Sequence, residues 1–255
     1  MKVLATISLI FCFYLSNAQR ADSSLIEAID KPINLRSNRR LESLILPTAA
    51  ITYGFISLGN NGLRTLNNST EIEIQEHNPG SVTKWDNYLQ YSSAVAVYAL
   101  NAFGIKGKHN FRDRTFIYAL STGISTAVVS PLKHFTKEER PDGSDSRSFP
   151  SGHTTTAFAN AEFMRQEYKN VSAWYGVAGY AAATATGILR LYNNKHWVGD
   201  VVAGAGVGIL STKLAYLIYP AIKKNFFKDK PMHALAMPFY QNKAGGISIV
   251  YNINH

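Results

Sequence analysis

Residues 190–219 read RLYNNKHWVGDVVAGAGVGILSTKLAYLIY. The stretch opens with an arginine, a histidine and an aspartate, and then becomes apolar enough to predict a long helix from about Trp197 to Tyr219. Gly204 and Gly208 stand four residues apart on one face of that helix, a spacing that favours close packing against another helix. A charged cluster is therefore expected at the start of a tightly packed helix.

Upstream of this helix the sequence contains further apolar or helix-like segments. They cover approximately residues 41–58, 88–105, 115–132, 153–168 and 173–190. With the last helix they predict an all-α fold, an up-and-down bundle of about six apolar helices that is membrane-embedded or membrane-attached. The segment 153–168 contains Glu162, Arg165 and Glu167, which makes it a poor lipid-facing span.

The regions outside the bundle are polar or weakly patterned. Residues 60–86 are rich in Gly, Asn and Glu and are predicted to form a loop or irregular segment. Residues 226–255 form a basic segment and a tail, and the tail's weak alternation predicts two short strands around Asn242 to Gly246. The helical bundle itself is expected to occupy residues 41–225, after a polar N-terminal segment at 19–40.

Residues 1–18 resemble a secretory signal peptide. Lys2 precedes a short apolar run, and Ser16-Asn17-Ala18 forms a small-x-small cleavage site. An uncleaved anchor helix is the alternative interpretation. The chain's single cysteine, Cys12, lies in this segment, so cleavage would leave no thiol for a disulfide or a nucleophile.

Composition leaves several partners open. Of the 255 residues, 46% are apolar and only 17% are charged, while the formal net charge is +9. A basic chain can bind nucleic acid, a membrane surface or an anionic substrate. No long Lys/Arg run with interleaved aromatics is present, so nucleic acid is the least favoured of these partners.

Three polar clusters carry the chemistry. They are Lys133 followed by Arg140-Pro141, the tetrapeptide Pro150-Ser151-Gly152-His153, and the set Arg190, His196 and Asp200. Each cluster alone has an ordinary structural explanation, such as a membrane-flanking charge, a helix start or a local ion pair. In an up-and-down bundle, however, all three fall at the same end, and so many cations would repel one another unless an anion lay among them.

Phosphate suits such a site. Lysine and arginine grip its non-bridging oxygens, and backbone N–H groups at a helix start add donors. Two histidines can share acid and base work near neutral pH, and a carboxylate can fix the tautomer of one ring. With one carboxylate and several cations, the cluster is a poor ligand set for Mg²⁺ or Zn²⁺, so no metal or other cofactor is expected.

The three clusters, in this order and with these gaps, resemble the signature of the type 2 phosphatidic acid phosphatase family. That family shares its fold and site with vanadium haloperoxidases and bacterial class A acid phosphatases, and the resemblance covers about residues 85 to 220. One position departs from the pattern, because Leu189 stands where the family usually has a serine. A hydroxyl that contacts phosphate is therefore missing.

The resemblance implies a role for each site residue. His196 attacks phosphorus and forms a phosphohistidine, Asp200 orients it, and His153 protonates the leaving alkoxide and then activates water. The remaining residues hold the phosphoryl oxygens: Lys133, Arg140, Arg190, Ser151 and Gly152.

The resemblance also implies a lipid phosphate substrate, either a monoester or a diphosphate. Lipid A phosphate, phosphatidylglycerol phosphate and undecaprenyl diphosphate all fit. Basic flanks at 36–40, 106–114 and 223–230 indicate cytoplasmic loops, which would place the site at the periplasmic face of a bacterial envelope membrane. A cleaved signal is incompatible with this count for six full spans, so the number of spans stays open. No protein partner is expected.

Three alternatives remain at this stage. They are a soluble-type non-specific acid phosphatase, a vanadate-dependent haloperoxidase and a non-enzymatic membrane protein with a phosphate-binding pocket.

Overall fold

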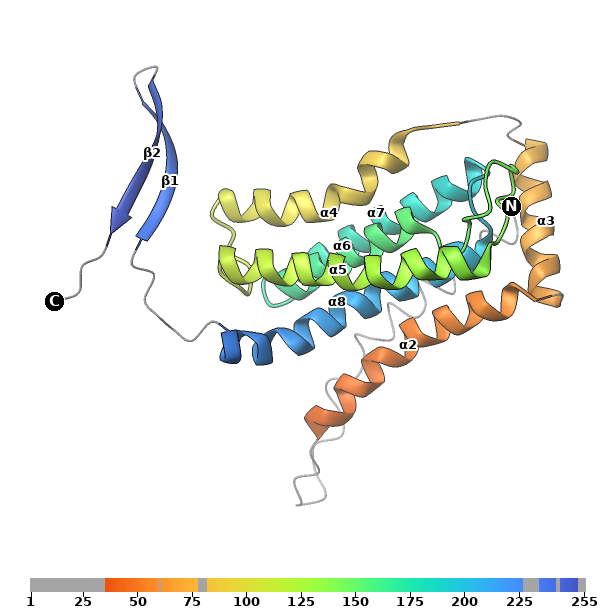
Figure 1. Cartoon of the computed structure of the whole chain (residues 1–255), viewed down its shortest axis with the longest axis horizontal. Helices are drawn as coiled ribbons and strands as arrows, with labels where there is room; N and C mark the ends of the chain where they lie inside the picture. The colour runs from red at the N-terminus through yellow and green to blue at the C-terminus, as the bar shows by residue number, and fades with distance from the viewer. Residues whose placement is uncertain (1–34, 60, 78–81, 227–233, 242–243, 252–255) are drawn as a thin grey trace.

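The computed structural model describes residues 35–59, 61–77, 82–226, 234–241 and 244–251. Seven helices and one antiparallel strand pair occur in these ranges (Figure 1): α2 (Leu35–Ser57), α3 (Gly62–His77), α4 (Trp85–Ala102), α5 (Phe111–Thr136), α6 (Gly152–Tyr168), α7 (Ala173–Tyr192), α8 (Val198–Phe226), β1 (Ala234–Gln241) and β2 (Ala244–Tyr251). Six of the helices match the predicted segments, so the all-α bundle is confirmed. The expected pair of tail strands is also present, with Gln241 opposite Ala244. The predicted signal peptide at 1–18 lies outside the described residues.

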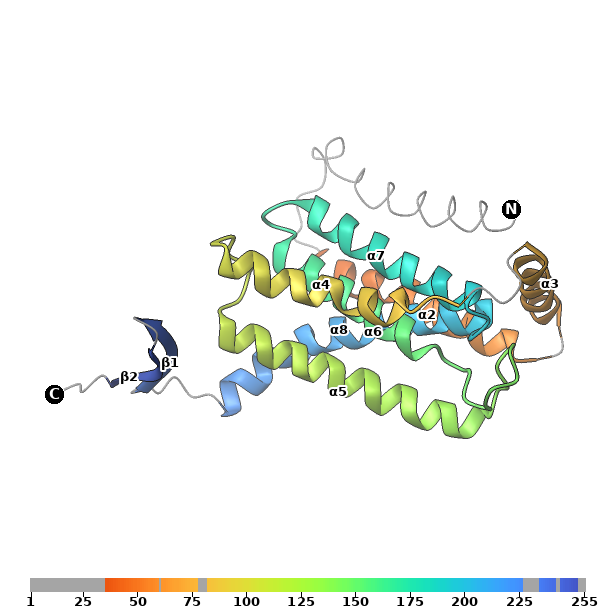
Figure 2. The same cartoon turned by 90° about the horizontal axis from the view of Figure 1, so that it is seen from above.

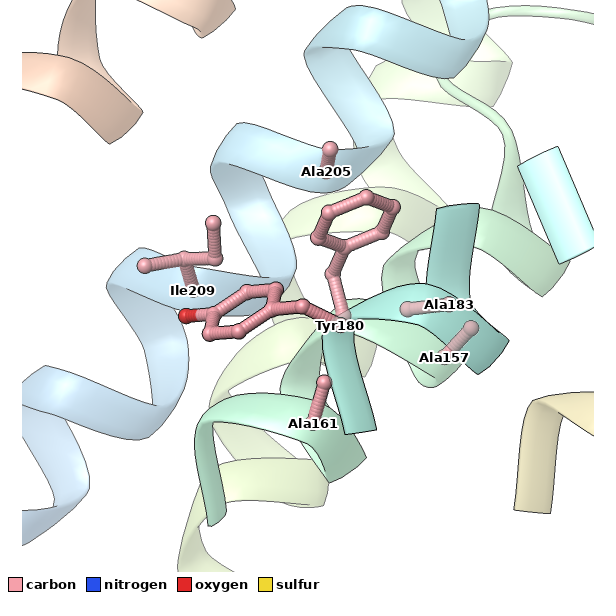
Figure 3. Close-up of a cluster of buried hydrophobic side chains, with 7 residues drawn as sticks. Ala157, Ala161, Tyr180, Ala183, Ala205 and Ile209 are labelled. Carbon is pink, nitrogen blue, oxygen red and sulfur yellow. The ribbon is translucent and has the colours of Figure 1, made fainter. Parts of the chain in front are cut away.

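Helix α6 is the centre of the bundle (Figure 2). It packs against α4, α5, α7 and α8, and twelve of its 17 residues are buried. Figure 3 shows the contact that it makes with α7 and α8, where Tyr180 lies among small side chains and Ile209. Because α6 is enclosed by protein, its low hydropathy does not bear on whether the bundle crosses a membrane.

The acidic residues of α6 are paired inside the bundle. Glu162 accepts hydrogen bonds from Arg165 and from the Tyr180 hydroxyl. Glu167 is fully buried, and it accepts from the ring of His109 at 2.7 Å and from Arg114 at 3.2 Å. A buried carboxylate is tolerable only when it is paired and hydrogen-bonded, and both of these are.

Glycines let α8 approach its neighbours. A Cβ on Gly204 would lie 2.6 Å from the carbonyl oxygen of Ser151, at the start of α6. A Cβ on Gly206 would lie 2.5 Å from the carbonyl of Pro47 in α2. Helix α8 is therefore clamped between α6 and α2, and the close packing predicted for Gly204 is confirmed.

The predicted loop at 60–86 is partly wrong, because residues 62–77 form helix α3. The Asn61 side chain caps it by accepting the N–H of Leu63 at 2.9 Å. Its buried residues are Asn67, Thr70 and Ile74. Because two of these three are polar, the sequence shows no apolar periodicity that would predict a helix. In Figure 1, α3 lies across one end of the bundle.

Two described helices are long and apolar enough to cross a membrane, namely α5 and α8. Only 17% of the most apolar window of α5 is buried, against 56% for α8. Helix α5 thus presents a long apolar surface outward, whereas much of α8 packs inside the bundle.

Candidate active site

The residues predicted to form a site gather at the end of the bundle that α3 covers (Figure 2). Three chain segments meet there: the loop between α5 and α6, the turn between α7 and α8, and the start of α4. The Lys133 ammonium reaches into the first loop and donates to the carbonyls of Arg147 and Ser148 at 2.5 and 3.2 Å. The structure thus brings together segments that are far apart in the sequence.

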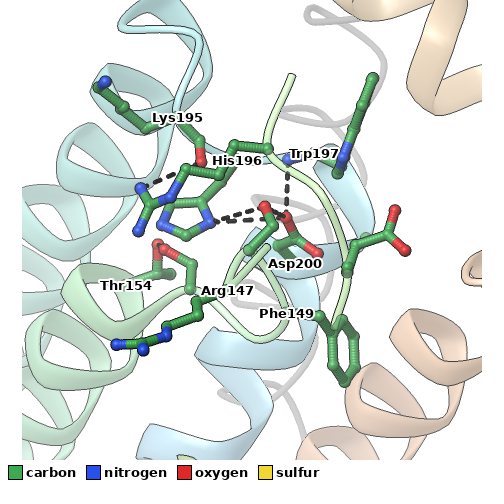
Figure 4. A network of polar contacts seen from close by, with 12 residues as sticks. Arg147, Phe149, Thr154, Lys195, His196, Trp197 and Asp200 are labelled. Carbon is green, nitrogen blue, oxygen red and sulfur yellow. Dashed lines mark hydrogen bonds and ion pairs between the residues drawn. The ribbon is translucent and has the colours of Figure 1, made fainter. Parts of the chain in front are cut away.

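His196 and Asp200 form the buried centre of the site (Figure 4). His196 is 3% exposed and Asp200 is 1% exposed. Asp200 Oδ2 lies 3.5 Å from His196 Nδ1 and accepts the Trp197 N–H at 2.9 Å. The hydroxyl of Ser148 contacts both side chains, lying 3.3 Å from Nδ1 and donating to the carboxylate. All these ring contacts engage Nδ1, which leaves Nε2 as the nitrogen to meet a substrate.

The neighbours of these two residues hold the turn in place. The Trp197 indole donates to the carbonyl of Glu139 at 2.8 Å, and the Arg64 guanidinium of α3 lies 5.0 Å from the centre of the Trp197 ring. The Asn67 side chain accepts the N–H of Gly199 at 3.1 Å. Helix α3 therefore supports the turn that carries His196, a function that the sequence pattern did not indicate.

The two arginines of the site are each paired with a carboxylate. Arg140 Nε donates to Asp145 at 2.8 Å, and this hydrogen bond holds the pKa of Asp145 below its usual value. Arg190 NH1 donates to Asp86 at 2.5 Å, and both residues are buried. The Arg190 Nε–H is also buried and has no partner among the described residues. One donor of this guanidinium is thus available for an incoming anion.

Asp86 and Asn87, at the start of α4, were not predicted. Asn87 Oδ1 lies 2.8 Å from His153 Nε2. An amide oxygen can only accept, so in this arrangement Nε2 carries the hydrogen. Asp86 is 104 residues from its partner Arg190 in the sequence, and Asn87 is 66 residues from His153. No local pattern in the sequence marks such contacts.

Ser151 and Gly152 begin α6. The Ser151 N–H, expected to point at phosphate, instead donates to the carbonyl of Asp200 at 3.0 Å. Its hydroxyl accepts from Thr154 at 2.9 Å. Gly152 faces the cation, because a Cβ there would lie 3.9 Å from Lys133 Cε. Ser151 thus joins the start of α6 to α8, and Gly152 leaves room beside the ammonium group.

Burial and the surrounding cations keep both histidines neutral. Burial, followed by the charges of Lys133 and Arg190, holds the pKa of His196 well below its usual value. Burial, followed by the charge of Arg190, lowers the pKa of His153 to about 4. Neutral His196 retains the lone pair that a nucleophile needs. An anion bound among the same cations would raise both pKa values.

The balance of charge differs from the sequence-based expectation of a single carboxylate. Asp86 and Asp145 join Asp200, so three carboxylates face Lys133 and the two arginines. Each carboxylate is already engaged by an arginine or by Ser148. Within the described ranges no three His, Cys, Asp or Glu side chains are arranged to share a metal ion. Leu189 is half-buried in α7 and supplies no hydroxyl.

The chain is similar in sequence to known proteins. Residues 114–224 match the model of the PAP2 superfamily. The chain is 42% identical over 137 residues to the Lipid A 1-phosphatase of Porphyromonas gingivalis, a match that covers 53% of this chain and 31% of that protein. The chain thus spans about a third of the length of that curated relative.

Two solved structures align with part of the chain. A transmembrane PAP2-type phosphatidylglycerolphosphate phosphatase from Bacillus subtilis superposes with a TM-score of 0.50 at 20% identity, covering 71% of this chain and 98% of that one. LpxE from Aquifex aeolicus gives a TM-score of 0.42 at 21% identity over 56% of this chain and 92% of its own. The match to the PAP2 superfamily model at 114–224 includes every predicted site residue.

Proposed function

We propose that the chain is a metal-independent phosphatase that hydrolyses a lipid phosphate, as a monoester or diphosphate, through a phosphohistidine. The observation that carries the proposal is the gathering of buried His196 and half-buried His153 beside Lys133, Arg140 and Arg190. The unpartnered Nε–H of Arg190 gives that cluster a free donor for a phosphoryl oxygen.

In the first step the Nε2 lone pair of His196 attacks phosphorus. The bound phosphate raises the pKa of His153, so the ring takes up a proton when substrate binds. The P–N bond then forms as the P–O bond to the lipid breaks, and the leaving oxygen takes that proton from His153. Lys133, Arg140 and Arg190 stabilise the negative charge on the equatorial oxygens. The Nδ1 hydrogen of His196 stays in place, so the phosphorylated ring carries a positive charge next to Asp200.

In the second step water attacks the phosphohistidine. His153, now neutral, takes a proton from the water while the new P–O bond forms. The P–N bond breaks, its electron pair returns to Nε2 of His196, and inorganic phosphate is released. Each histidine ends in its starting protonation state, with the acid proton regenerated on His153.

Exposed aromatic side chains support a membrane location. Six large aromatic side chains are between 67% and 85% exposed. Three lie near the end of the bundle that holds the site, namely Trp85, Tyr88 and Phe135. The other three lie near the opposite end, namely Phe103, Phe111 and Trp174. The 18-residue helix α4 runs between these two groups of aromatic residues and spans about 27 Å, close to the thickness of a bilayer's hydrocarbon core. Aromatic rings at both interfaces are typical of membrane proteins.

Basic residues support an orientation with the site at the periplasmic face. Lys106 and Lys108 lie between α4 and α5, and Arg112 lies in the first turn of α5. Lys223 and Lys224 lie near the end of α8, so all five are at the end opposite the site. Loops rich in Lys and Arg stay on the cytoplasmic side. The catalytic end would then face the other compartment.

The substrate that we infer first is a lipid A phosphate, because the relative at 42% identity is a Lipid A 1-phosphatase. The test is phosphate release by purified protein from lipid A phosphate, phosphatidylglycerol phosphate and undecaprenyl diphosphate, with EDTA present. His196→Ala should abolish release, whereas His77→Ala, an exposed histidine on α3, should not change it. Intact release by His196→Ala would refute the proposed mechanism, and activity that required vanadate and halide would indicate a haloperoxidase.

A further inference from the structure

Ser148 lies between the two residues that the family signature pairs directly. The distance from His196 Nδ1 to Asp200 Oδ2 is 3.5 Å, so Nδ1 lies farther from the carboxylate than from the Ser148 hydroxyl oxygen. The Ser148 hydroxyl is 3.3 Å from Nδ1 and forms a short hydrogen bond to the same carboxylate oxygen. Ser148 is fully buried, so water does not compete for these contacts.

The direction of each hydrogen bond follows from the groups involved. An ionised carboxylate only accepts, so the Ser148 hydroxyl donates to Asp200. The oxygen of Ser148 then offers its lone pair to Nδ1, which must carry the ring's hydrogen. Asp200 Oδ2 also accepts the Trp197 N–H, so its capacity is largely filled without a direct bond to the ring.

The backbone of Ser148 is fixed on both sides. Its N–H donates to the carbonyl of Glu138 at 2.9 Å, and its own carbonyl accepts from the Lys133 ammonium at 3.2 Å. The next residue, Phe149, is fully buried and packs edge-on against Phe55, with ring centres 5.0 Å apart. The hydroxyl is therefore held in place between the ring and the carboxylate.

We propose that Ser148 is a positioning residue that relays the charge of Asp200 to His196, a role that rests on the phosphohistidine mechanism proposed above. The hydroxyl keeps the hydrogen on Nδ1, so that the lone pair lies on Nε2. When Nε2 becomes phosphorylated, the chain Nδ1–H···Oγ–H···Oδ2 stabilises the positive ring. No proton leaves any of the three groups in this step.

The test is a double-mutant cycle measured on p-nitrophenyl phosphate, using Ser148→Ala, Asp200→Asn and the double variant. Ser148→Ala should lower kcat about 10- to 100-fold, the effect of losing a hydrogen bond to a charged group. The inhibition constant for inorganic phosphate should stay within a factor of about three, because the cations that bind it are untouched. Ser146→Ala, an exposed serine of the same loop, is the matched control.

Coupling between the two sites is the decisive readout. In the Asp200→Asn background, Ser148→Ala should cost less than about threefold, because the relay is already broken. Nitrogen-15 shifts of His196 should show Nδ1–H in the parent protein and a mixture of tautomers in Ser148→Ala. Independent, multiplicative losses, or an unchanged tautomer, would overturn the relay.

Two controls separate the possible failures. If Ser148→Ala does not fold, Ser148→Cys keeps nearly the same shape with a weaker donor and should show the same coupled loss. An inactive His196→Ala beside a fully active Ser148→Ala would refute the relay alone. An active His196→Ala would refute the phosphohistidine mechanism on which the relay depends.

Discussion

Replacing Asn87 with aspartate puts a negative charge against the candidate acid. The amide oxygen of Asn87 lies 2.8 Å from His153 Nε2, and aspartate has nearly the same shape. Burial and the charge of Arg190 lower the pKa of His153 to about 4, so its ring is neutral at pH 7 before substrate binds. A carboxylate in place of the amide stabilises the protonated ring and must raise that pKa.

The size of the shift follows from the contact. An opposite charge at this range moves a pKa by about 1–3 units, and solvent screening at exposed Asn87 favours the lower half. The pKa of His153 should therefore rise from about 4 to roughly 5–6. At pH 7 the protonated fraction of the free enzyme's acid rises roughly 10- to 100-fold. In the pH profile of kcat/KM for a lipid phosphate, the descending limb due to His153 should move to higher pH by the same number of units as the pKa of His153.

The pKa is measured by an NMR titration of nitrogen-15-labelled His153, and the profile by steady-state assays between pH 4 and 9. Asn68→Asp adds the same charge to an exposed position on α3 and should leave the pKa unchanged. If Asn87→Asp leaves the pKa of His153 where it was, or lowers it, the hydrogen bond to Asn87 does not position this ring.

Four further outcomes are expected. Phosphate release should survive EDTA and gain nothing from Mg²⁺. Vanadate should compete at concentrations well below the KM of the substrate. The protein should take up protons when vanadate binds, as calorimetry in buffers of different ionisation enthalpy would show. His153→Ala should lose about 10²–10⁴-fold in activity on a lipid phosphate but much less on p-nitrophenyl phosphate, whose leaving group needs no proton. His196→Ala should be inactive on both substrates. Equal losses of activity on both substrates for His153→Ala would show that His153 is not the general acid. Gly204→Ala should lower the free energy of unfolding by about 1–3 kcal/mol in denaturant titrations, because its Cβ would meet the Ser151 carbonyl at 2.6 Å, and unchanged stability would contradict the tight contact of α8 with α6.

The sequence predicted the bundle because apolar helices leave a long, simple signal. It also predicted the site residues that belong to compact motifs, such as His153 and His196, because the bundle's topology returns these motifs to one end. Helix α3 was missed because its buried positions include Asn67 and Thr70, which pattern reading assigns to a surface.

The sequence analysis did not predict three residues of the candidate site, and the reason differs from that for α3. Asp86, Asn87 and Ser148 act through single contacts to groups far away in the chain, and each stands in an ordinary polar context. Their importance depends on distances between side chains, which helix periodicity does not encode. The Asp86–Arg190 pair also shows that the argument from repelling cations overstated the positive charge of the site.

The pairing of Arg190 with Asp86 has a consequence for turnover. Because the carboxylate stays on one side of the guanidinium, Arg190 never presents its full charge to an anion in the site. In the proposed mechanism, a phosphate ion released from His196 would meet a partly neutralised arginine and would leave more easily than from three unpaired cations. In that mechanism the carboxylate that pairs with the arginine would also limit the retention of inorganic phosphate between cycles.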